Sequence, residues 1–231
     1  MIISVPLADL RLKKQNCSQD FSHDDFRNSQ LLFGERVELL EKGEWPHIYA
    51  PEQGLFGYVH ASEISPYKEK PTHVITTFDD ELPFGSFGTK GRPLSKSFSR
   101  KQLIEDALQF LGMPYLWGGR SNHRQGPIGS VDCSGLINLV YRAQGILIPR
   151  DSGPQCRFSK ECEKLLPGDL IYLGDPISHV IMKVDEDLFI EAPQTGKSVR
   201  LLRWGQDIWD DGKLCFADRE KRYSKYYRSI V

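Results

Sequence analysis

The spacing of apolar residues changes twice along this chain of 231 residues, and the order of the patterns limits the folds available to it. Apolar and polar residues alternate in short runs up to about residue 66 and recur at helical spacing between residues 99 and 145. After residue 165 they form short β-branched and aromatic runs. Helices followed by strands are typical of an α+β domain. We therefore expect an α+β domain over residues 99–231, preceded by a small all-β unit over residues 1–68.

The first unit has turn residues about every 8 to 12 positions between its strand-like runs, which is typical of a small barrel. A unit of this size buries only a thin core, so we expect it to pack against its neighbour. Residues 69–98 are rich in Pro, Gly, Ser and Thr but also contain Phe78, Phe84 and Phe87. Because these aromatic side chains favour burial, the segment is predicted to be an ordered connector.

Two helices are predicted at the start of the second domain. The first begins after Ser99, a suitable N-cap, and is followed by Gly112. The second begins at Cys133 and ends before Gly145, with apolar residues along one face. Farther on, "GDLIYLGDPISHVIMKVDEDLFIEAP" predicts three antiparallel strands separated by Gly-Asp-Pro and Asp-Glu-Asp turns.

Charge and apolar content argue against two classes of partner. The chain contains 30 basic and 31 acidic residues, a net charge of −1, and has no basic stripe of the kind that binds nucleic acid. No stretch approaches about 18 uninterrupted apolar residues. Pro6, Asp9 and Arg11 interrupt the N-terminal apolar run too early for a secretory signal. We therefore expect a cytoplasmic protein that binds neither nucleic acid nor membranes, and we favour a monomer.

One of the five cysteines lies where a thiol has a chemical use. Their odd number and the absence of a C-x-x-C pair argue against a disulfide framework or a zinc site. Cys133 follows Asp132 at the start of the second predicted helix, where backbone N–H groups and the helix dipole favour a thiolate and could hold an oxyanion. Simple packing of Cys133 is the alternative. Its small or polar neighbours Asp132, Ser134 and Gly135 favour a crevice that admits a substrate backbone.

A nucleophilic thiol needs a base, and the base needs an orienting group. Among the six histidines, His179 alone lies within a convincing strand of the second domain. If Lys183 pairs with Asp187, Glu191 lies directly across from His179 on the same face. A carboxylate there would fix the imidazole tautomer. A two-residue turn would instead direct Glu191 to the other face, as a solvated residue at a strand end.

Six pieces of sequence resemble the NlpC-type cysteine peptidases, bacterial enzymes with a papain-like α+β core that cut peptidoglycan stem peptides. The pieces occur in the family's order: "PYLWGG" (114–119), "DCSGL" (132–136), "PRDSGPQ" (149–155), "PGDLIYL" (167–173), "SHVIMKV" (178–184) and "FIEAPQTG" (189–196). Residues 1–68 resemble the bacterial SH3-like barrel that often precedes this catalytic domain. The chain departs from the family in two places. Glu191 stands where a second His is common, and the loop between Trp117 and Cys133 is longer than usual.

The resemblance implies a nucleophile at Cys133, a base at His179 and an orienting residue at Glu191. The substrate that it implies is a stem peptide with a free N-terminal L-Ala, cut between γ-D-Glu and a diamino acid such as meso-diaminopimelate. Contacts with this substrate are expected from polar residues of the crevice, namely Tyr115, Asp132, Ser134, Asp151 and Ser152. In such relatives the barrel closes one end of the groove, and Glu35 or Tyr58 is the candidate here.

The sequence thus predicts a cysteine endopeptidase that acts on peptidoglycan fragments through a thioester on Cys133, with no metal or organic cofactor. Two alternatives remain open. The same fold can carry an N-acetylmuramoyl-L-alanine amidase or an acyltransferase. The replacement of the common His by Glu191 leaves room for a non-catalytic sensor of wall fragments.

Overall fold

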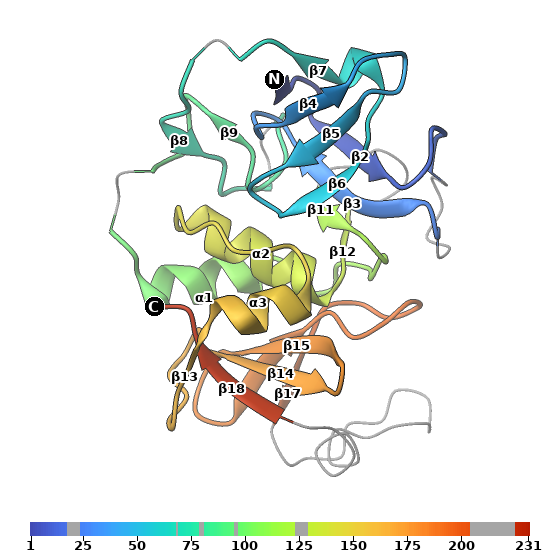
Figure 1. Ribbon diagram of the computed structural model, residues 1–231. Coiled ribbons are helices and arrows are strands. Elements are labelled where there is room, and N and C mark those ends of the chain that lie inside the picture. The colour runs from blue at the N-terminus through green and yellow to red at the C-terminus, as the bar shows by residue number, and fades with distance from the viewer. Residues whose placement is uncertain (18–23, 68, 79–80, 95–96, 123–128, 204–224) are drawn as a thin grey trace.

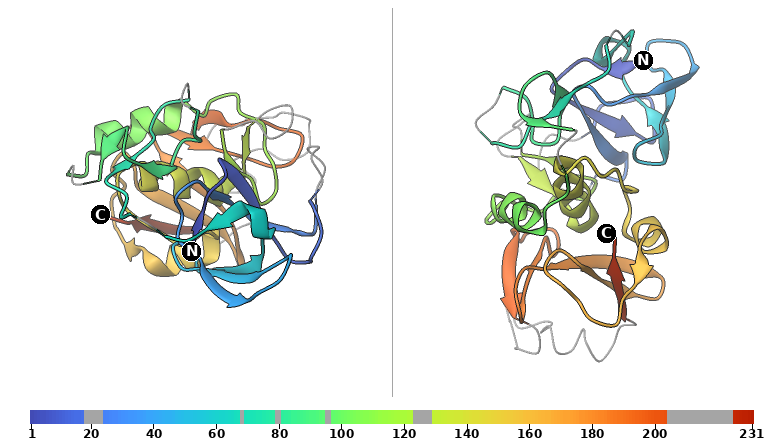
Figure 2. Two further views of the ribbon diagram at one scale, coloured as in Figure 1. Left: turned by 90° about the horizontal axis from the view of Figure 1, so that it is seen from above. Right: turned by 90° about the vertical axis from the view of Figure 1, so that its left-hand side faces the viewer.

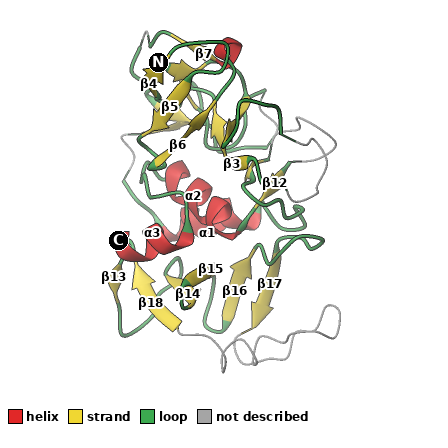
Figure 3. Ribbon diagram, turned by 45° about the vertical axis from the view of Figure 1, so that its right-hand side comes forward, coloured by secondary structure: helices red, strands yellow, loops and turns green. Residues whose placement is uncertain are grey.

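The computed structural model describes residues 1–17, 24–67, 69–78, 81–94, 97–122, 129–203 and 225–231. Three helices lie between an N-terminal β unit and a C-terminal sheet (Figure 1). The same three layers are seen with helices and strands in separate colours (Figure 3). The protein is therefore a mixed α/β structure with few helices and several antiparallel sheets.

The described residues of the N-terminal unit form strands and one short 3-10 helix, Ala61–Glu63. Its main sheet has five antiparallel strands in the order β3-β2-β6-β5-β4, and β1 pairs with β7. The strands are β1 (Ile2–Ile3), β2 (Leu7–Arg11), β3 (Arg27–Leu32), β4 (Glu38–Glu41), β5 (His47–Ala50), β6 (Leu55–Tyr58) and β7 (Ile64–Ser65). The predicted all-β character of this unit is confirmed, whereas its SH3-like class stays a prediction.

Strand β2 shows how the N-terminal unit packs against the rest of the molecule. All five residues of this strand are buried. Ala8 and Leu10 belong to the core of the unit itself, whereas Leu7 joins the larger core that the helices form with the C-terminal sheet. Successive side chains of a strand point to opposite faces, so β2 is covered on both sides. The expectation that this small unit packs on its neighbour is confirmed.

The connector is ordered where the structure describes it. Three short strands, β8 (His73–Val74), β9 (Phe87–Gly88) and β10 (Arg92–Pro93), form a sheet in the order β10-β8-β9. Phe84 is fully buried, and its ring makes edge-on contacts with the rings of Phe78 and Phe110 at 5.8 and 5.1 Å between centroids. Aromatic burial thus holds this segment in place, as its composition predicts.

The helices are α1 (Arg100–Leu108), α2 (Cys133–Ala143) and α3 (Ser152–Phe158). Ser99 caps α1, because its side chain accepts a hydrogen bond from the Gln102 N–H at 3.3 Å. Every residue of α2 is buried, and Gly145 follows this helix with a φ of +75°. The first two helices confirm the prediction, whereas α3 was not expected. Among the described residues, no helix is long and apolar enough to span a membrane.

The C-terminal sheet has six antiparallel strands in the order β13-β18-β14-β15-β16-β17. They are β13 (Lys160–Glu161), β14 (Leu170–Gly174), β15 (Ile177–Lys183), β16 (Leu188–Glu191), β17 (Arg200–Arg203) and β18 (Lys225–Ser229). A hairpin of β11 (Arg120–Ser121) and β12 (Ser130–Val131) lies before α2. The three predicted strands correspond to β14, β15 and β16. Helices cover one face of this sheet, with the N-terminal unit beyond them (Figure 2).

Candidate active site

A cavity of about 620 Å³ lies between the N-terminal unit and the C-terminal domain. The N-terminal unit lines it with Leu12, Asp25, Arg27 and Asn28. The other wall surrounds the predicted nucleophile and consists of Tyr115, Trp117, Gly118, Asp132, Cys133, Ser134, Asp151, Ser152, Gly153, Pro154, Ile177 and Ser178. The structure thus brings all the residues predicted to contact substrate to one cavity.

Cys133 is the first residue of α2 and is 7% exposed. Asp132 caps the helix, since its side chain accepts a hydrogen bond from the Gly135 N–H at 2.7 Å. The thiol therefore lies at the helix N-terminus, as predicted. A side chain at position 135 would overlap the carbonyl oxygen of Gly119. The predicted crevice at Cys133 is present, lined by Asp132 and Ser134, whereas Gly135 makes room for the protein's own chain at Gly119.

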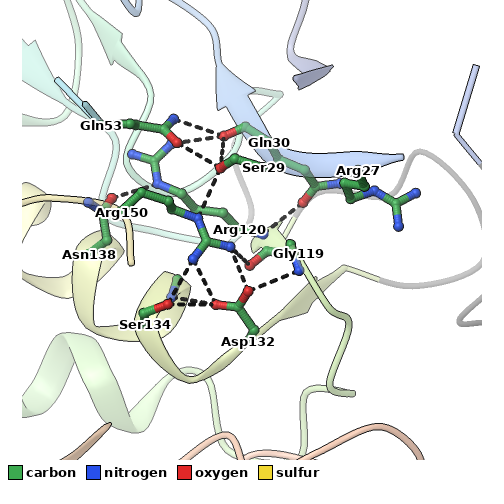
Figure 4. Close-up of polar contacts among 12 residues, drawn as sticks. Arg27, Ser29, Gln30, Gln53, Gly119, Arg120, Asp132, Ser134, Asn138 and Arg150 are labelled. Carbon is green, nitrogen blue, oxygen red and sulfur yellow. Dashed lines mark hydrogen bonds and ion pairs between the residues drawn. The ribbon is translucent and has the colours of Figure 1, made fainter. Parts of the chain in front are cut away.

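Arg150 connects the start of α2 to the N-terminal unit (Figure 4). Its two terminal nitrogens donate to Asp132 Oδ1 at 2.9 Å and to Asp132 Oδ2 at 2.7 Å. The guanidinium also donates to Ser134 Oγ at 2.9 Å, and its Nε donates to Ser29 Oγ of β3 at 2.9 Å. The polar atoms of Asp132 and Ser134 are therefore already hydrogen-bonded to Arg150 where these residues line the cavity. Because Arg150 also bonds Ser29 of β3, the N-terminal unit helps to fix their positions.

Neither residue proposed to close the groove lines this cavity. Glu35 is 1% exposed and accepts hydrogen bonds from Arg120 and from Gln53, the latter at 2.9 Å. Burial tends to raise the pKa of Glu35, but the charges of Arg120 and Arg142 outweigh it and lower the pKa. Tyr58 contacts the ring of a neighbouring histidine on the N-terminal sheet instead. The expectations for Glu35 and Tyr58 are therefore wrong, and Glu35 is part of a buried ionic interface.

His179, on β15, connects the thiol to a buried carboxylate. Its Nε2 lies 2.7 Å from Oε2 of Glu191, and the imidazole lies beside the Cys133 side chain, which acts to raise its pKa. Burial alone would lower the pKa of His179. The contacts with Cys133 and Glu191, with the charges of both groups, outweigh burial and raise the pKa to about 9. The imidazole is therefore protonated at neutral pH, and the three residues predicted as catalytic form one connected array.

The register of β15 and β16 differs in detail from the expected one. Lys183 pairs with Phe189, so Glu191 lies across from Ile181 rather than directly across from His179. The loop still contains an odd number of residues, and this parity keeps Glu191 and His179 on the same face. The prediction that Glu191 and His179 share a face is therefore confirmed, whereas the prediction that they lie directly across from each other is wrong. A diagonal pair remains within reach because both side chains are long.

The array has a fourth member that the sequence did not reveal. Arg200, on β17, lies directly across from Glu191. Its Nε and one terminal nitrogen donate to Glu191 Oε1 at 3.0 and 2.8 Å, while Oε2 contacts His179. The short strand "RLLR" has no alternating apolar pattern, so β17 was not predicted. An arginine within about ten positions of a predicted catalytic carboxylate was the available signal.

Asp151 and Tyr115 give the cavity its polar chemistry. Asp151 precedes α3 at the N-cap position, but its side chain makes no capping hydrogen bond. Burial raises the pKa of Asp151, Arg150 opposes this effect and Asp132 adds to it. Burial, followed by the charges of Cys133 and Asp132, also raises the pKa of Tyr115. Tyr115 is therefore a neutral hydroxyl beside the thiol, and Ser152 adds a second hydroxyl to the cavity wall.

The other cysteines that the structure describes lie apart from this array. In the described part of the chain, none of Cys17, Cys133, Cys156 and Cys162 forms a disulfide, and no group of three or more His, Cys, Asp or Glu residues could hold a metal ion. Burial, reinforced by the charge of Asp9, raises the pKa of Cys17 to about 12. The fifth cysteine, Cys215, and residues 123–128 of the loop predicted to be long lie outside the described residues.

Comparison with known proteins shows what this part of the chain resembles. The profile of the "NlpC/P60 family" matches residues 112–217. A "Gamma-D-glutamyl-L-lysine dipeptidyl-peptidase" of Bacillus subtilis (strain 168) is 28% identical over 85% of this chain and 82% of its own length. A protein of the same name from Bacillus cereus (strain ATCC 10987 / NRS 248) is 36% identical, over 43% of this chain and 30% of its own length.

The fold has a counterpart along the whole chain. The crystal structure of an NlpC/P60 family protein from Bacillus cereus ATCC 10987 covers 100% of this chain and 99% of its own, with a TM-score of 0.74 at 20% identity. This likeness shows a shared fold. The profile match includes Cys133, His179 and Glu191. Residues 112–217 are therefore similar to the NlpC/P60 family.

Proposed function

We propose that this protein is a cysteine endopeptidase that hydrolyses peptidoglycan stem peptides between γ-D-Glu and a diamino acid. The observation that carries the proposal is the connected array of Cys133, His179 and Glu191 at a cavity between the two units. The similarity to the NlpC/P60 family and the names of the Bacillus relatives support a peptidase that acts on this class of bond.

The array can perform both halves of a thioester mechanism. The Cys133 sulfur attacks the carbonyl carbon of the scissile amide, and backbone N–H groups at the start of α2 hold the resulting oxyanion. His179 gives its proton to the departing amine, the C–N bond breaks, and a thioester remains on Cys133. Neutral His179 then takes a proton from water, which attacks the thioester and releases the new carboxylate. Throughout, Glu191 keeps the imidazole in one orientation.

The cavity supports a substrate with a free N-terminal amine. The Asp151 carboxylate makes no capping hydrogen bond, so it can pair with an ammonium group in the cavity. Ser152 and Tyr115 offer hydroxyls for the peptide backbone, and Asp25 adds a second carboxylate from the N-terminal unit. This wall between the two units would exclude longer chains and favour fragments that begin with L-Ala. We propose this selectivity as part of the function.

Defined peptides test the proposed function. We expect the protein to cut L-Ala-γ-D-Glu-L-Lys and its meso-diaminopimelate analogue into L-Ala-γ-D-Glu and the free diamino acid, as read by mass spectrometry. Cys133→Ala should lower kcat/KM by at least about 1,000-fold. Cys162→Ala, which changes a free thiol away from the cavity, should leave the rate unchanged.

Other outcomes distinguish the alternatives. Release of the intact tripeptide from a muramyl-linked substrate, with no internal cut, would identify an amidase. Transfer of the L-Ala-γ-D-Glu acyl group to an added amine in preference to water would identify an acyltransferase. Binding of the tripeptide without turnover by the wild-type protein would identify a sensor and overturn the proposed peptidase.

A further inference from the structure

The Glu191 carboxylate is shared between two cationic groups. Its side chain is 0% exposed, and its two oxygens have different partners. Oε2 contacts His179 at 2.7 Å, whereas Oε1 accepts from Arg200 Nε at 3.0 Å and from an Arg200 terminal nitrogen at 2.8 Å. Cross-strand pairing of Glu191 with Arg200 fixes this arrangement in the sheet. Arg200 therefore occupies one oxygen and leaves the other for the imidazole.

We propose that Arg200 is a positioning residue of the catalytic array, which aims the Glu191 carboxylate at His179 and limits how tightly that pair holds its proton. The effect on turnover rests on the proposed peptidase function. The effect on the His179 proton does not, because it follows from geometry and charge alone. A two-donor contact with one oxygen restricts rotation of the carboxylate, and such restriction is what a fixed imidazole orientation requires.

The charges around the Glu191–His179 pair predict the direction in which the loss of Arg200 changes its proton affinity. When His179 loses its proton, Glu191 remains as a buried anion, and Arg200 is a cation that compensates it. Without Arg200, the deprotonated pair would leave a buried charge with less compensation, so the pair would keep its proton to higher pH. Without the charge of Glu191, His179 would lose its proton at lower pH. The two substitutions therefore act in opposite directions, a pattern that general loosening of the structure would not produce.

The other groups near His179 in the described part of the chain do not change the predicted direction of these shifts. Strand β14 places the uncharged Leu173 beside it in register. Helix α2 contributes Cys133, and Asp151, the N-cap residue of α3, lines the cavity that Cys133 also lines. These groups remain in place in both variants, so they shift both titrations equally. On β15 itself, Lys183 pairs with Phe189 at the far end of the strand.

Histidine NMR on the full-length protein tests the proposal without requiring turnover. The His179 signal is identified as the one missing from His179→Gln. In the wild-type protein we expect it to titrate near the value of about 9. Arg200→Leu should move this midpoint upward and Glu191→Gln should move it downward, each by about one pH unit or more. Arg200→Lys, which restores the charge, should return the midpoint close to that of the wild type.

Kinetics then test the positioning role. With a stem tripeptide, Arg200→Leu should lower kcat by up to about 100-fold with little change in KM. Arg200→Lys should recover only part of the rate, because one ammonium lacks the paired donors of a guanidinium. The matched control is Arg203→Leu. Arg203 lies on the same strand and bonds the exposed carboxylate of Asp187 at 2.9 and 2.8 Å, and its loss should change neither readout.

The His179 midpoint and the kcat of the Arg200 variants can each contradict the proposal. An Arg200→Leu midpoint at the wild-type value, or one that moves downward as in Glu191→Gln, would overturn the proposal. If Arg200→Leu does not fold, Arg200→Lys carries the test, and an unchanged kcat in that variant would contradict positioning. If the variants shift the His179 midpoint as predicted but the wild-type protein cuts no stem peptide, the role of Arg200 is upheld and the proposed function is rejected.

Discussion

At the scale of single residues, the proton on His179 determines how the site responds to pH. Burial opposes the charged imidazole, but Cys133 and Glu191 outweigh burial and raise the His179 pKa from 6.5 to about 9. Because the folded state binds this proton more tightly than the unfolded chain, the proton contributes to stability. That contribution is complete below a pH of about 6.5 and disappears as the pH rises through about 9.

Removal of the imidazole should therefore lower the free energy of unfolding most in mild acid. We expect His179→Gln to lower the free energy of unfolding by about 2 kcal/mol near pH 6, and by clearly less above pH 9. Urea unfolding at the two pH values measures the difference. A cost that grows with pH would show that His179 is not held as a cation in the folded protein.

At the scale of secondary structure elements, the start of α2 depends on Asp132. The Asp132 carboxylate both caps the helix and pairs with the buried Arg150. Asp151, the N-cap residue of α3, makes no capping hydrogen bond and instead lines the cavity. Both N-cap aspartates line the cavity, but only the Asp132 carboxylate also caps its helix and pairs with Arg150.

Alanine at each aspartate tests this difference. Asp132→Ala should cost about 3 to 5 kcal/mol of unfolding free energy, because it leaves the Arg150 guanidinium buried without its carboxylate. Asp151→Ala should cost less than about 1 kcal/mol but raise KM for peptides with a free N-terminal amine. Urea unfolding and peptide kinetics measure the two effects. Equal stability losses would contradict the distinction.

The same elements show what the sequence could and could not predict. The start of α2 was predictable because Asp132, Cys133 and an apolar stripe within the helix are local signals. Helix α3 was missed because Ser152–Phe158 has seven residues, includes Gly153 and Pro154, and shows no helical periodicity. The β16 register and Arg200 were missed because strand pairing depends on loop geometry and on a partner strand with no pattern of its own.

At the scale of the whole molecule, buried charges join the N-terminal unit to the helices. Glu35 pairs with Arg120 and Arg142, and Gln30 accepts from the Arg120 backbone N–H at 2.8 Å. Glu35 and Arg120 are 85 positions apart in the chain, so no sequence pattern linked them. The core also continues from Leu7 of β2 into the helices. The two units are therefore expected to unfold in one transition.

Loss of the Glu35 carboxylate should destabilise both units together. We expect Glu35→Ala to lower the unfolding free energy by about 3 to 5 kcal/mol, since two arginines stay buried with less compensation. Glu38→Ala, an exposed acid on β4, should change it by less than about 0.5 kcal/mol. Fluorescence and circular dichroism during urea unfolding should give coincident curves. Separate transitions for the two units would contradict a shared interface.

The lowered pKa of Glu35 also predicts how the stability of the protein changes in acid. Its arginine partners outweigh burial and lower its pKa, so its contribution is present above the ordinary carboxylate pKa of 4.5 and is lost as the pH falls through the lowered value. The stability gap between the wild-type protein and Glu35→Ala should therefore narrow in strong acid. A gap that widens on acidification would contradict a paired carboxylate.

The central claim is that Cys133 forms a thioester with the γ-D-Glu carbonyl of a stem peptide, assisted by His179. Rapid acid quenching of the protein with L-Ala-γ-D-Glu-L-Lys, followed by intact-mass measurement and peptide mapping, tests it most directly. We predict a transient mass increase equal to L-Ala-γ-D-Glu less water, located on the peptide that contains Cys133 and absent from Cys133→Ala. Peptide cleavage that proceeds at the wild-type rate in Cys133→Ala would contradict the claim.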